Sequence, residues 1–296
     1  MASTELSTTN FPLPGSAPAE VVVPAPGPGP QRWAGAPCAV LDRDGSVLLV
    51  YRVRAGQLSG IGRDYNVIAR SPDGVRFTPL VILRPDRFGA AMVERAALVP
   101  LPHAGWRLYV SCATPGSKAW WIGMVEAADL AGLADAPVRP IFPADDRAGY
   151  KDPVIHRDPT GWHAWVCCHP LDVPGAEDRM STAYATSDDG LRWDWHGTVL
   201  TGRPGEWDAR GARLTAVLPD GRAAYDGRAT AEENWFERTA LAAPGRAHEL
   251  SAIPDSPIVD VRYLEVLALP GGGWRIYYEA RLPDESHELR TELVAD

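Results

Sequence analysis

Five stretches of this chain repeat one pattern: GSVLLVY (Gly45–Tyr51), GWRLYVS (Gly105–Ser111), GWHAWVC (Gly161–Cys167), GRAAYDG (Gly221–Gly227) and GWRIYYE (Gly273–Glu279). Each begins with a turn glycine and continues as a short apolar and aromatic strand. The glycines follow one another at steps of 60, 56, 60 and 52 residues. A period of this size, built from short strands, is typical of propeller blades. We therefore predict an all-β, five-bladed β-propeller with four antiparallel strands per blade around an axial funnel.

The repeat continues without interruption, which predicts a single propeller domain over residues 31–296. Residues 1–30 read as an N-terminal tail that is rich in proline and alanine, ending in Pro24–Pro30. Within this tail, the apolar run Ala19–Val23 could form a strand that closes the ring. The 28 glycines and 28 prolines fall mostly between apolar runs, as expected for many tight turns.

Composition narrows the classes of function. The net charge of −9 provides no basic surface for a phosphate backbone, so we expect no nucleic-acid partner. The N-terminus lacks a basic start and an apolar core, and no apolar run is long enough for a membrane span. These features predict a soluble, cytoplasmic protein without a membrane partner. The sequence leaves the oligomeric state open.

Cofactor and metal motifs are not found in the sequence. The four cysteines lie in apolar segments without paired metal spacing, so we expect buried reduced thiols. There is no glycine-rich dinucleotide fingerprint after a strand and no phosphate-binding loop. No histidine and cysteine spacing specifies zinc. We therefore expect no cofactor and no metal.

Carboxylates precede the repeat glycines at matching positions in several units. Glu94, Asp152, Asp208 and Asp260 follow one another at steps of 58, 56 and 52 residues. Because the innermost strands of a propeller begin near one mouth of the axis, we expect these side chains to converge on one cavity. Converging carboxylates repel each other, so one of them tends to keep its proton near neutral pH. A protonated acid beside an ionised partner is what acid/base cleavage of a glycosidic bond requires.

Further polar and aromatic residues lie at the ends of the second strands and in the adjoining loops. Aromatic faces pack against the C–H surface of a sugar, while charged groups hydrogen-bond its hydroxyls. The sequence leaves open whether His169 is a general base, a sugar ligand or a structural hydrogen-bonding group. The candidate substrate-binding residues are Arg52, Arg63, Asp64, Arg95, Lys118, Trp120, His169, Arg210, Asp226, Arg228, Glu237 and Glu279.

From about Trp33 to its end, the chain resembles the five-bladed propeller glycosidases of glycoside hydrolase families 43, 32 and 68 and relatives such as family 130. The sharpest local match is Lys151–His156 (KDPVIH), which is similar to the Asp-Pro signature at the start of a first strand in those families. The turns Ser71–Phe77 and Ser187–Trp193, each reading Ser-x-Asp-Gly-x-x-aromatic, add to the resemblance.

The resemblance implies three catalytic acids on three successive blades. Asp152 then takes the middle role, tuning pKa values or binding hydroxyls, and Glu94 takes the base or nucleophile position. The remaining acid comes from Gly205–Arg210, where position favours Asp208 and the family preference for glutamate favours Glu206. The substrate implied is a small glycoside whose glycosyl group is cleaved or transferred.

Two other functions fit the same expected fold. Arg52, Arg54, Arg63, Arg95 and Lys118 could create a phosphate site, which suits a glycoside phosphorylase; a non-hydrolytic tailoring enzyme is a related alternative. A non-catalytic carbohydrate-binding propeller is the third possibility. It is favoured if the acids are paired one-to-one with Arg95, Arg210 and Arg262 and closed off from solvent.

Overall fold

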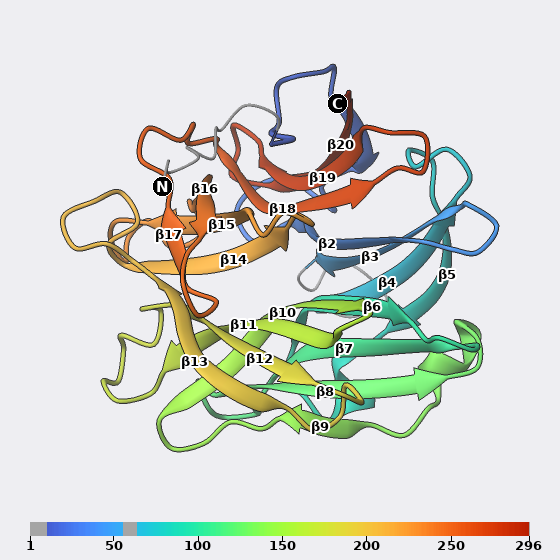
Figure 1. Ribbon diagram of the computed structural model, residues 1–296, viewed down its shortest axis with the longest axis horizontal. Helices are drawn as coiled ribbons and strands as arrows, with labels where there is room; N and C mark the ends of the chain where they lie inside the picture. The colour runs from blue at the N-terminus through green and yellow to red at the C-terminus, as the bar shows by residue number, and fades with distance from the viewer. Residues whose placement is uncertain (1–10, 56–63, 296) are drawn as a thin grey trace.

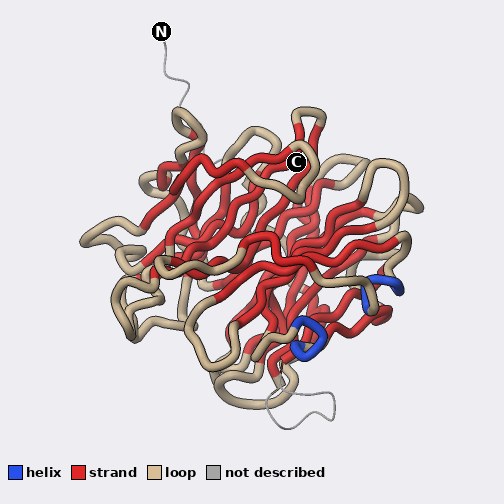
Figure 2. Tube along the Cα trace, turned by 90° about the horizontal axis from the view of Figure 1, so that it is seen from below, coloured by secondary structure: helices blue, strands red, loops and turns tan. Residues whose placement is uncertain are grey.

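The computed structural model describes residues 11–55 and 64–295, and within these ranges the chain is built almost entirely of β-strands. Among the described residues, Figure 2 shows helix, in blue, only as short segments. They are single turns of 3₁₀ helix, Pro85–Phe88 and Ala131–Ala134. In the described part of the chain, no helix is long and apolar enough to cross a membrane.

Three sheets contain four antiparallel strands each, in chain order from the first strand to the fourth. The first of these sheets is β6 (Val93–Pro100), β7 (Trp106–Ala113), β8 (Trp120–Ala127) and β9 (Arg139–Phe142). The next is β10 (Ala148–Asp158), β11 (Gly161–Pro170), β12 (Ser181–Ser187) and β13 (Asp194–Thr201). The third is β14 (Gly211–Val217), β15 (Ala223–Arg228), β16 (Arg238–Pro244) and β17 (Leu250–Ala252).

A fourth sheet contains eight strands and joins the two ends of the chain. One half of it is β2 (Trp33–Leu41), β3 (Val47–Arg54), β4 (Asp64–Ser71) and β5 (Thr78–Leu83). The other half is β18 (Val261–Ala268), β19 (Trp274–Arg281), β20 (His287–Val294) and β1 (Glu20–Val23), which pairs with β20. A single parallel pair, Trp33 with His287, connects the halves.

The strands β2, β6, β10, β14 and β18 lie toward the middle of the molecule (Figure 1). Each of these first strands contacts the next, and β18 contacts β2, so together they surround one axis. Every first strand also departs from regular pairing at one point, for example between Val93 and Ala96 and between Lys151 and Val154. A bulge bends the strand and redirects a side chain, which makes it a device for building a site.

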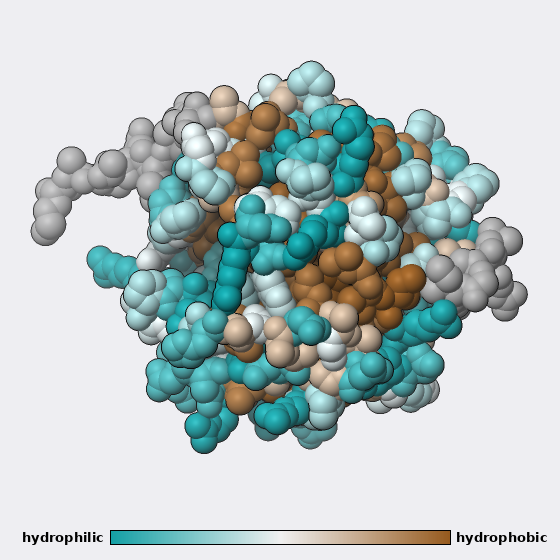
Figure 3. Space-filling model, turned by 90° about the vertical axis from the view of Figure 1, so that its right-hand side faces the viewer, coloured by the Kyte–Doolittle hydropathy of each residue, from teal (hydrophilic) through white to brown (hydrophobic). Residues whose placement is uncertain are grey.

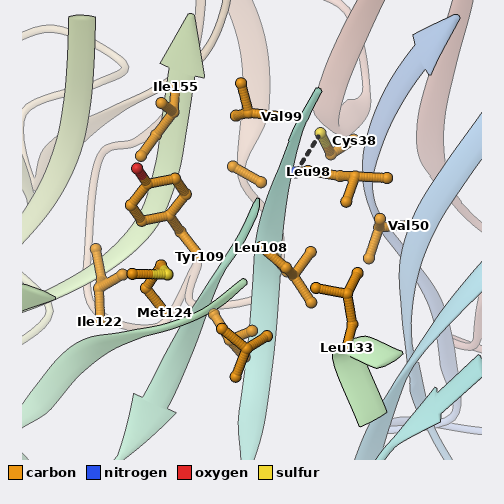
Figure 4. Close-up of a cluster of buried hydrophobic side chains, with 14 of the residues drawn as sticks. Cys38, Val50, Leu98, Val99, Leu108, Tyr109, Ile122, Met124, Leu133 and Ile155 are labelled. Atoms are coloured by element: carbon orange, nitrogen blue, oxygen red, sulfur yellow. Dashed lines mark hydrogen bonds between the residues drawn. The ribbon is translucent and has the colours of Figure 1, made fainter. Parts of the chain in front are cut away.

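Apolar side chains hold neighbouring sheets together. Figure 4 shows one cluster in which Cys38 and Val50 of the eight-stranded sheet meet Leu98 and Leu108 of the next sheet. Ile155 of β10 joins the same cluster, which therefore spans three sheets. This packing matches the alternation of the repeat, whose apolar positions face adjacent sheets.

The N-terminal segment is packed against the last strands. The side chain of Phe11 is 6% exposed and lies in a cluster with Leu218 and Ile276. The backbone amides of Gly15 and Ala17 donate to the carboxylate of Glu292 on β20. The described part of the tail is thus held to the propeller body by three contacts: the packing of Phe11, the hydrogen bonds to Glu292, and the pairing of β1 with β20.

The surface is mixed in polarity. The side of the molecule that carries β5 shows a group of hydrophobic residues framed by hydrophilic ones (Figure 3). On β5 itself, the side chains of Leu80 and Ile82 are exposed. Strand β5 is an outer strand with one unpaired edge.

Candidate active site

A cavity of about 260 Å³ opens where the first strands begin. All four sheets contribute to it, because the starts of the first strands and the ends of the second strands meet there. Its aromatic lining comes from Trp33, Trp120, Trp235 and Tyr263. Its charged lining consists of Arg52, Arg54, Glu94, Lys118, Lys151, Glu177, Asp178, Arg213, Arg228, Glu237 and Arg262, with His169 beside them.

Glu94 is the carboxylate of this cavity that three cations surround. Nη2 of Arg54 donates to Oε1 of Glu94 over 2.9 Å, Nη1 of Arg52 lies 3.6 Å from the same oxygen, and Nζ of Lys151 contacts Oε2. Burial raises the pKa of Glu94, but the charges of Lys151, Arg52 and Arg54 outweigh burial and hold this pKa well below its usual value. Glu94 is therefore ionised at neutral pH.

Asp152 does not line the cavity and is fully buried, in a left-handed backbone conformation with φ of 50°. Its Oδ2 accepts hydrogen bonds from Nη1 of Arg213 and from the hydroxyl of Tyr263, both over 3.2 Å. Nζ of Lys151 is 3.7 Å from this oxygen, and Oδ1 of Asp152 has no hydrogen-bond partner. A strained, buried carboxylate beside a cavity is typical of a residue held for function.

Two further buried glutamates are clamped between arginines. Glu237 accepts from Nη1 of Arg228 at 2.6 Å and lies 2.8 Å from Nε of Arg262. Burial raises the pKa of Glu237, but the charges of Arg262, Arg213 and Arg228 lower it to about 2.

The second clamped glutamate is Glu279, which pairs with Nη2 of Arg52 at 2.9 Å and with Nη1 of Arg262 at 3.3 Å. Burial raises the pKa of Glu279, but Arg52, Arg262 and a hydrogen bond with His287 hold it well below its usual value. Trp33 stacks on His287 and carries the guanidinium of Arg54 4.8 Å above its ring. Glu279 does not line the cavity itself and instead pairs with Arg52 and Arg262, which do.

Asp226 has the opposite electrostatic setting. It is fully buried, and it accepts from Nη2 of Arg213 and from the hydroxyl of Thr239, both over 2.7 Å. The backbone amide of Tyr263 donates to it as well. Burial nevertheless raises the pKa of Asp226 above its usual value. Asp226 does not line the cavity and supports Arg213 from below.

Seven cations and four carboxylates line the cavity, and four more buried carboxylates outside the lining pair with these cations: Asp64, Asp152, Asp226 and Glu279. The aromatic and cationic groups also meet directly, since Nζ of Lys151 lies 4.3 Å from the centre of the Trp120 ring. Such a lining favours a ligand that combines an apolar ring face with oxygen atoms of negative charge.

Several residues predicted from the sequence lie elsewhere. Asp208 is buried against Nε of Arg203 and the hydroxyl of Tyr225, and Glu206 is exposed; neither lines the cavity. They lie in the loop before β14, which begins only at Gly211. Asp260 is likewise outside, exposed and paired with Arg281.

Among the predicted basic residues, Arg95 is buried outside the cavity lining and donates to Oε2 of Glu265 and to the carbonyl of Thr215. Arg210 pairs with Asp178, whose carboxylate reaches the cavity, and Asp64 pairs with Arg54. Arg63 lies outside the described residues. Arg52, Lys118, Trp120, His169, Arg228 and Glu237 line the cavity as expected from their positions at strand ends and in loops.

The sequence reasoning gave no role to Lys151, Arg213 and Tyr263. Lys151 stands beside Asp152 in the Asp-Pro motif, where the acid alone was considered. Arg213 and Tyr263 lie within the first strands β14 and β18. A search for polar residues inside these otherwise apolar strands, near their bulges, could have identified them.

No group of three or more histidine, cysteine, aspartate or glutamate side chains with the geometry of a metal site occurs among residues 11–55 and 64–295. The four cysteines are free, and burial raises the pKa of Cys38, Cys112 and Cys168 to about 12. Thiolates are therefore not part of the chemistry that this cavity offers.

No model of a known protein family matches the sequence, and no curated protein sequence matches it. Solved structures do resemble it. A β-1,2-mannobiose phosphorylase from Listeria innocua superposes with a TM-score of 0.64 at 16% identity, over 96% of this chain and 92% of that one. A sucrose-6-phosphate hydrolase from Lactobacillus gasseri gives 0.66 at 11% identity, over 96% and 62%.

A thermostable family-43 glycoside hydrolase gives a TM-score of 0.65 at 11% identity, over 88% of each chain. At sequence identities this low, the similarity shows the fold alone. The chain has the all-β propeller fold, built of four-stranded antiparallel sheets, that these glycoside hydrolases and this phosphorylase share.

Proposed function

We propose that the propeller has five blades. The eight-stranded sheet then counts as two blades, β2 to β5 and β18 to β20 with β1, which one residue pair joins at the seam. Two features support this count: the fivefold repeat in the sequence and the closed circuit of contacts among the five first strands.

We further propose that this protein cleaves or transfers the glycosyl group of a small glycoside in the cavity. The observation that carries the proposal is Glu94, an ionised carboxylate held at the wall of a cavity with three tryptophans. Tryptophan faces suit a sugar ring, and an ionised carboxylate suits attack on its anomeric carbon or activation of a water. The glycoside hydrolases and the phosphorylase of similar fold support the same substrate class.

In this proposal Glu94 is the base or nucleophile. Asp152 fixes Arg213 and Tyr263 and adds negative charge near Lys151, which is a positioning role. Asp208 and Glu206 receive no catalytic role because they do not reach the cavity.

Phosphorolysis is the second candidate, and one observation favours it. Seven lysine and arginine side chains line the cavity against four carboxylates, so an oxyanion can enter beside the sugar. Phosphate would then replace water as the species that attacks the anomeric carbon.

The test is turnover of a panel of aryl pyranosides and furanosides, with and without inorganic phosphate. We expect cleavage by the wild type and loss of cleavage in Glu94→Gln. Glu206→Gln makes the same chemical change at an exposed position outside the cavity and should keep full activity. Strict dependence on phosphate assigns phosphorolysis. Equal turnover of wild type and Glu94→Gln contradicts the proposed role of Glu94.

A further inference from the structure

Five nitrogen atoms of cavity-lining residues are buried and have no hydrogen-bond partner: Nε of Arg52, Arg262, Arg213 and Arg228, and Nε2 of His169. Of these four arginines, Arg213 and Arg228 act electrostatically on His169. The terminal nitrogens of both arginines are occupied. Arg213 uses them on Asp152, Tyr263 and Asp226, and Arg228 uses them on Glu237 and Asp178. A buried donor without a partner costs about 1–3 kcal/mol, so the unpartnered donors on this cavity favour a bound ligand that satisfies them.

His169 lies at the end of β11, and the charges that act on it come from three strands. Lys151 and Asp152 belong to β10, Arg213 to β14 and Arg228 to β15. Three of these four groups are cations. Burial, together with Lys151, Arg213 and Arg228, lowers the pKa of His169 to about 4, so its imidazole is neutral at pH 7.

We propose that an oxyanion binds among His169, Arg213 and Arg228, and that His169 takes up a proton when it binds. The unpartnered nitrogens become donors to the oxyanion, and Lys151 adds charge from the neighbouring strand. A negative charge beside the imidazole offsets the surrounding cations and favours the imidazolium. The inference deepens the proposed function and rests on it for the identity of the site.

The ligand chemistry is that of a fully ionised oxygen anion, tetrahedral or planar. It has two sources: a free anion that accompanies the sugar, or an acidic substituent on the sugar itself. Sulfate represents the first and glucuronate the second. Both keep the same charge between pH 6 and pH 8, so any proton that is taken up belongs to the protein.

The experiment is isothermal titration calorimetry at pH 7 with sulfate, glucuronate and neutral glucose, each in buffers of different ionisation enthalpy. Dependence of the observed heat on the buffer measures protons taken up on binding. For the wild type we expect an oxyanion to bind with uptake of about one proton, because the pKa of His169 rises from well below 7. Binding of sulfate assigns a free anion, and binding of glucuronate alone assigns an acidic substituent.

His169→Gln keeps a donor of similar reach and cannot titrate, so we expect it to bind the same oxyanion without proton uptake. His196→Gln is the matched control: it removes an exposed histidine on β13, and we expect wild-type proton uptake. Thermal unfolding of each variant confirms that it is folded.

Oxyanion binding without proton uptake by the wild type, or unchanged uptake in His169→Gln, overturns the role of His169. Absence of any oxyanion binding by folded protein overturns the site. Glu94→Gln separates this proposal from the proposed function, because it should lose turnover while it still binds the oxyanion.

Discussion

Nη2 of Arg54 on β3 donates a 2.9 Å hydrogen bond to Oε1 of Glu94 on β6, so a cation from one sheet holds the candidate base of the next. Arg54 is itself held by Asp64, whose Oδ1 accepts from its Nε over 2.8 Å. The position and charge of Glu94 therefore depend on contacts across the boundary between two sheets.

Replacing Glu94 by Gln should lower kcat for glycoside cleavage by about 100-fold or more, the typical contribution of a positioned acid or base. The same change leaves Arg52, Arg54 and Lys151 without their shared anion. Loss of one partner from a buried ionic group costs about 3–5 kcal/mol, so urea unfolding should show a lower free energy of unfolding. A variant of unchanged stability would contradict the ionic network described for Glu94.

Asp152→Asn and Asp152→Ala separate charge from backbone strain. Asparagine tolerates the left-handed conformation at this position better than alanine does, and its amide can still accept from Arg213 and Tyr263. We expect Asp152→Ala to be less stable than Asp152→Asn by about 1 kcal/mol or more. Chemical denaturation of both variants measures the difference, and equal stability would contradict the strain at Asp152.

The free energy of unfolding should decrease as the pH is lowered below about 4.5, in part because Glu237 becomes protonated. The pKa of Glu237 is lowered to about 2 from the usual value of 4.5, so the unfolded chain binds more protons than the folded one between these values. Its contribution is complete above pH 4.5 and is lost as the pH falls toward 2. We expect the free energy of unfolding of Glu237→Gln to change less between pH 5 and pH 3 than that of the wild type.

Measurement of urea unfolding at several pH values in that window decides this. If the wild type and Glu237→Gln show the same slope, Glu237 does not carry a lowered pKa in the folded protein.

Gly35 packs so closely on Glu279 that a methyl group there would overlap its carboxylate. Glu279 cannot move aside, because Arg52, Arg262 and His287 hold it. Gly35→Ala should therefore destabilise the protein by about 1–3 kcal/mol, as overpacking does. Gly271→Ala is the matched control, since no atom lies within 4 Å of its added methyl group. Differential scanning calorimetry compares the two, and equal melting temperatures would contradict the close packing.

Phe11→Ala tests the attachment of the N-terminal segment. The phenyl ring is buried with Leu218 and Ile276, and deletion of such a ring costs about 3–5 kcal/mol. We expect a clear fall in the free energy of unfolding measured with urea. Glu20→Gln, an exposed change on β1, should leave stability near that of the wild type. If Phe11→Ala leaves the free energy of unfolding unchanged, the N-terminal segment does not pack as described.

The repeat allowed the all-β propeller fold to be predicted, because a glycine followed by an apolar strand forms the same hairpin wherever it recurs. Turn glycines and period-two alternation are local signals that the sequence carries in full. The count of five blades rests on the same repeat and stays a proposal.

The residues of the site could be predicted only in part from the sequence. Glu94, which was expected in the base or nucleophile position, lines the cavity. It does so because β6 begins at Val93, where the spacing of the repeat predicts a first strand. Equal spacing fails for Asp208, since β14 begins only at Gly211 and leaves this residue in the preceding loop, beside Arg203. Arg213 and Lys151 were missed because a bulge, which redirects a side chain, has no signature in apolar periodicity.

The first strand of the chain pairs with the last, and Gly15 is hydrogen-bonded to a residue 277 positions away. On the ribosome, the N-terminal segment emerges long before its partner β20 has been synthesised. The seam can be sealed only after β20 has been synthesised, so its closure is a non-local step. A circular permutation that joins the present ends of the chain and opens new ones in an exposed hairpin would move ring closure to another sheet.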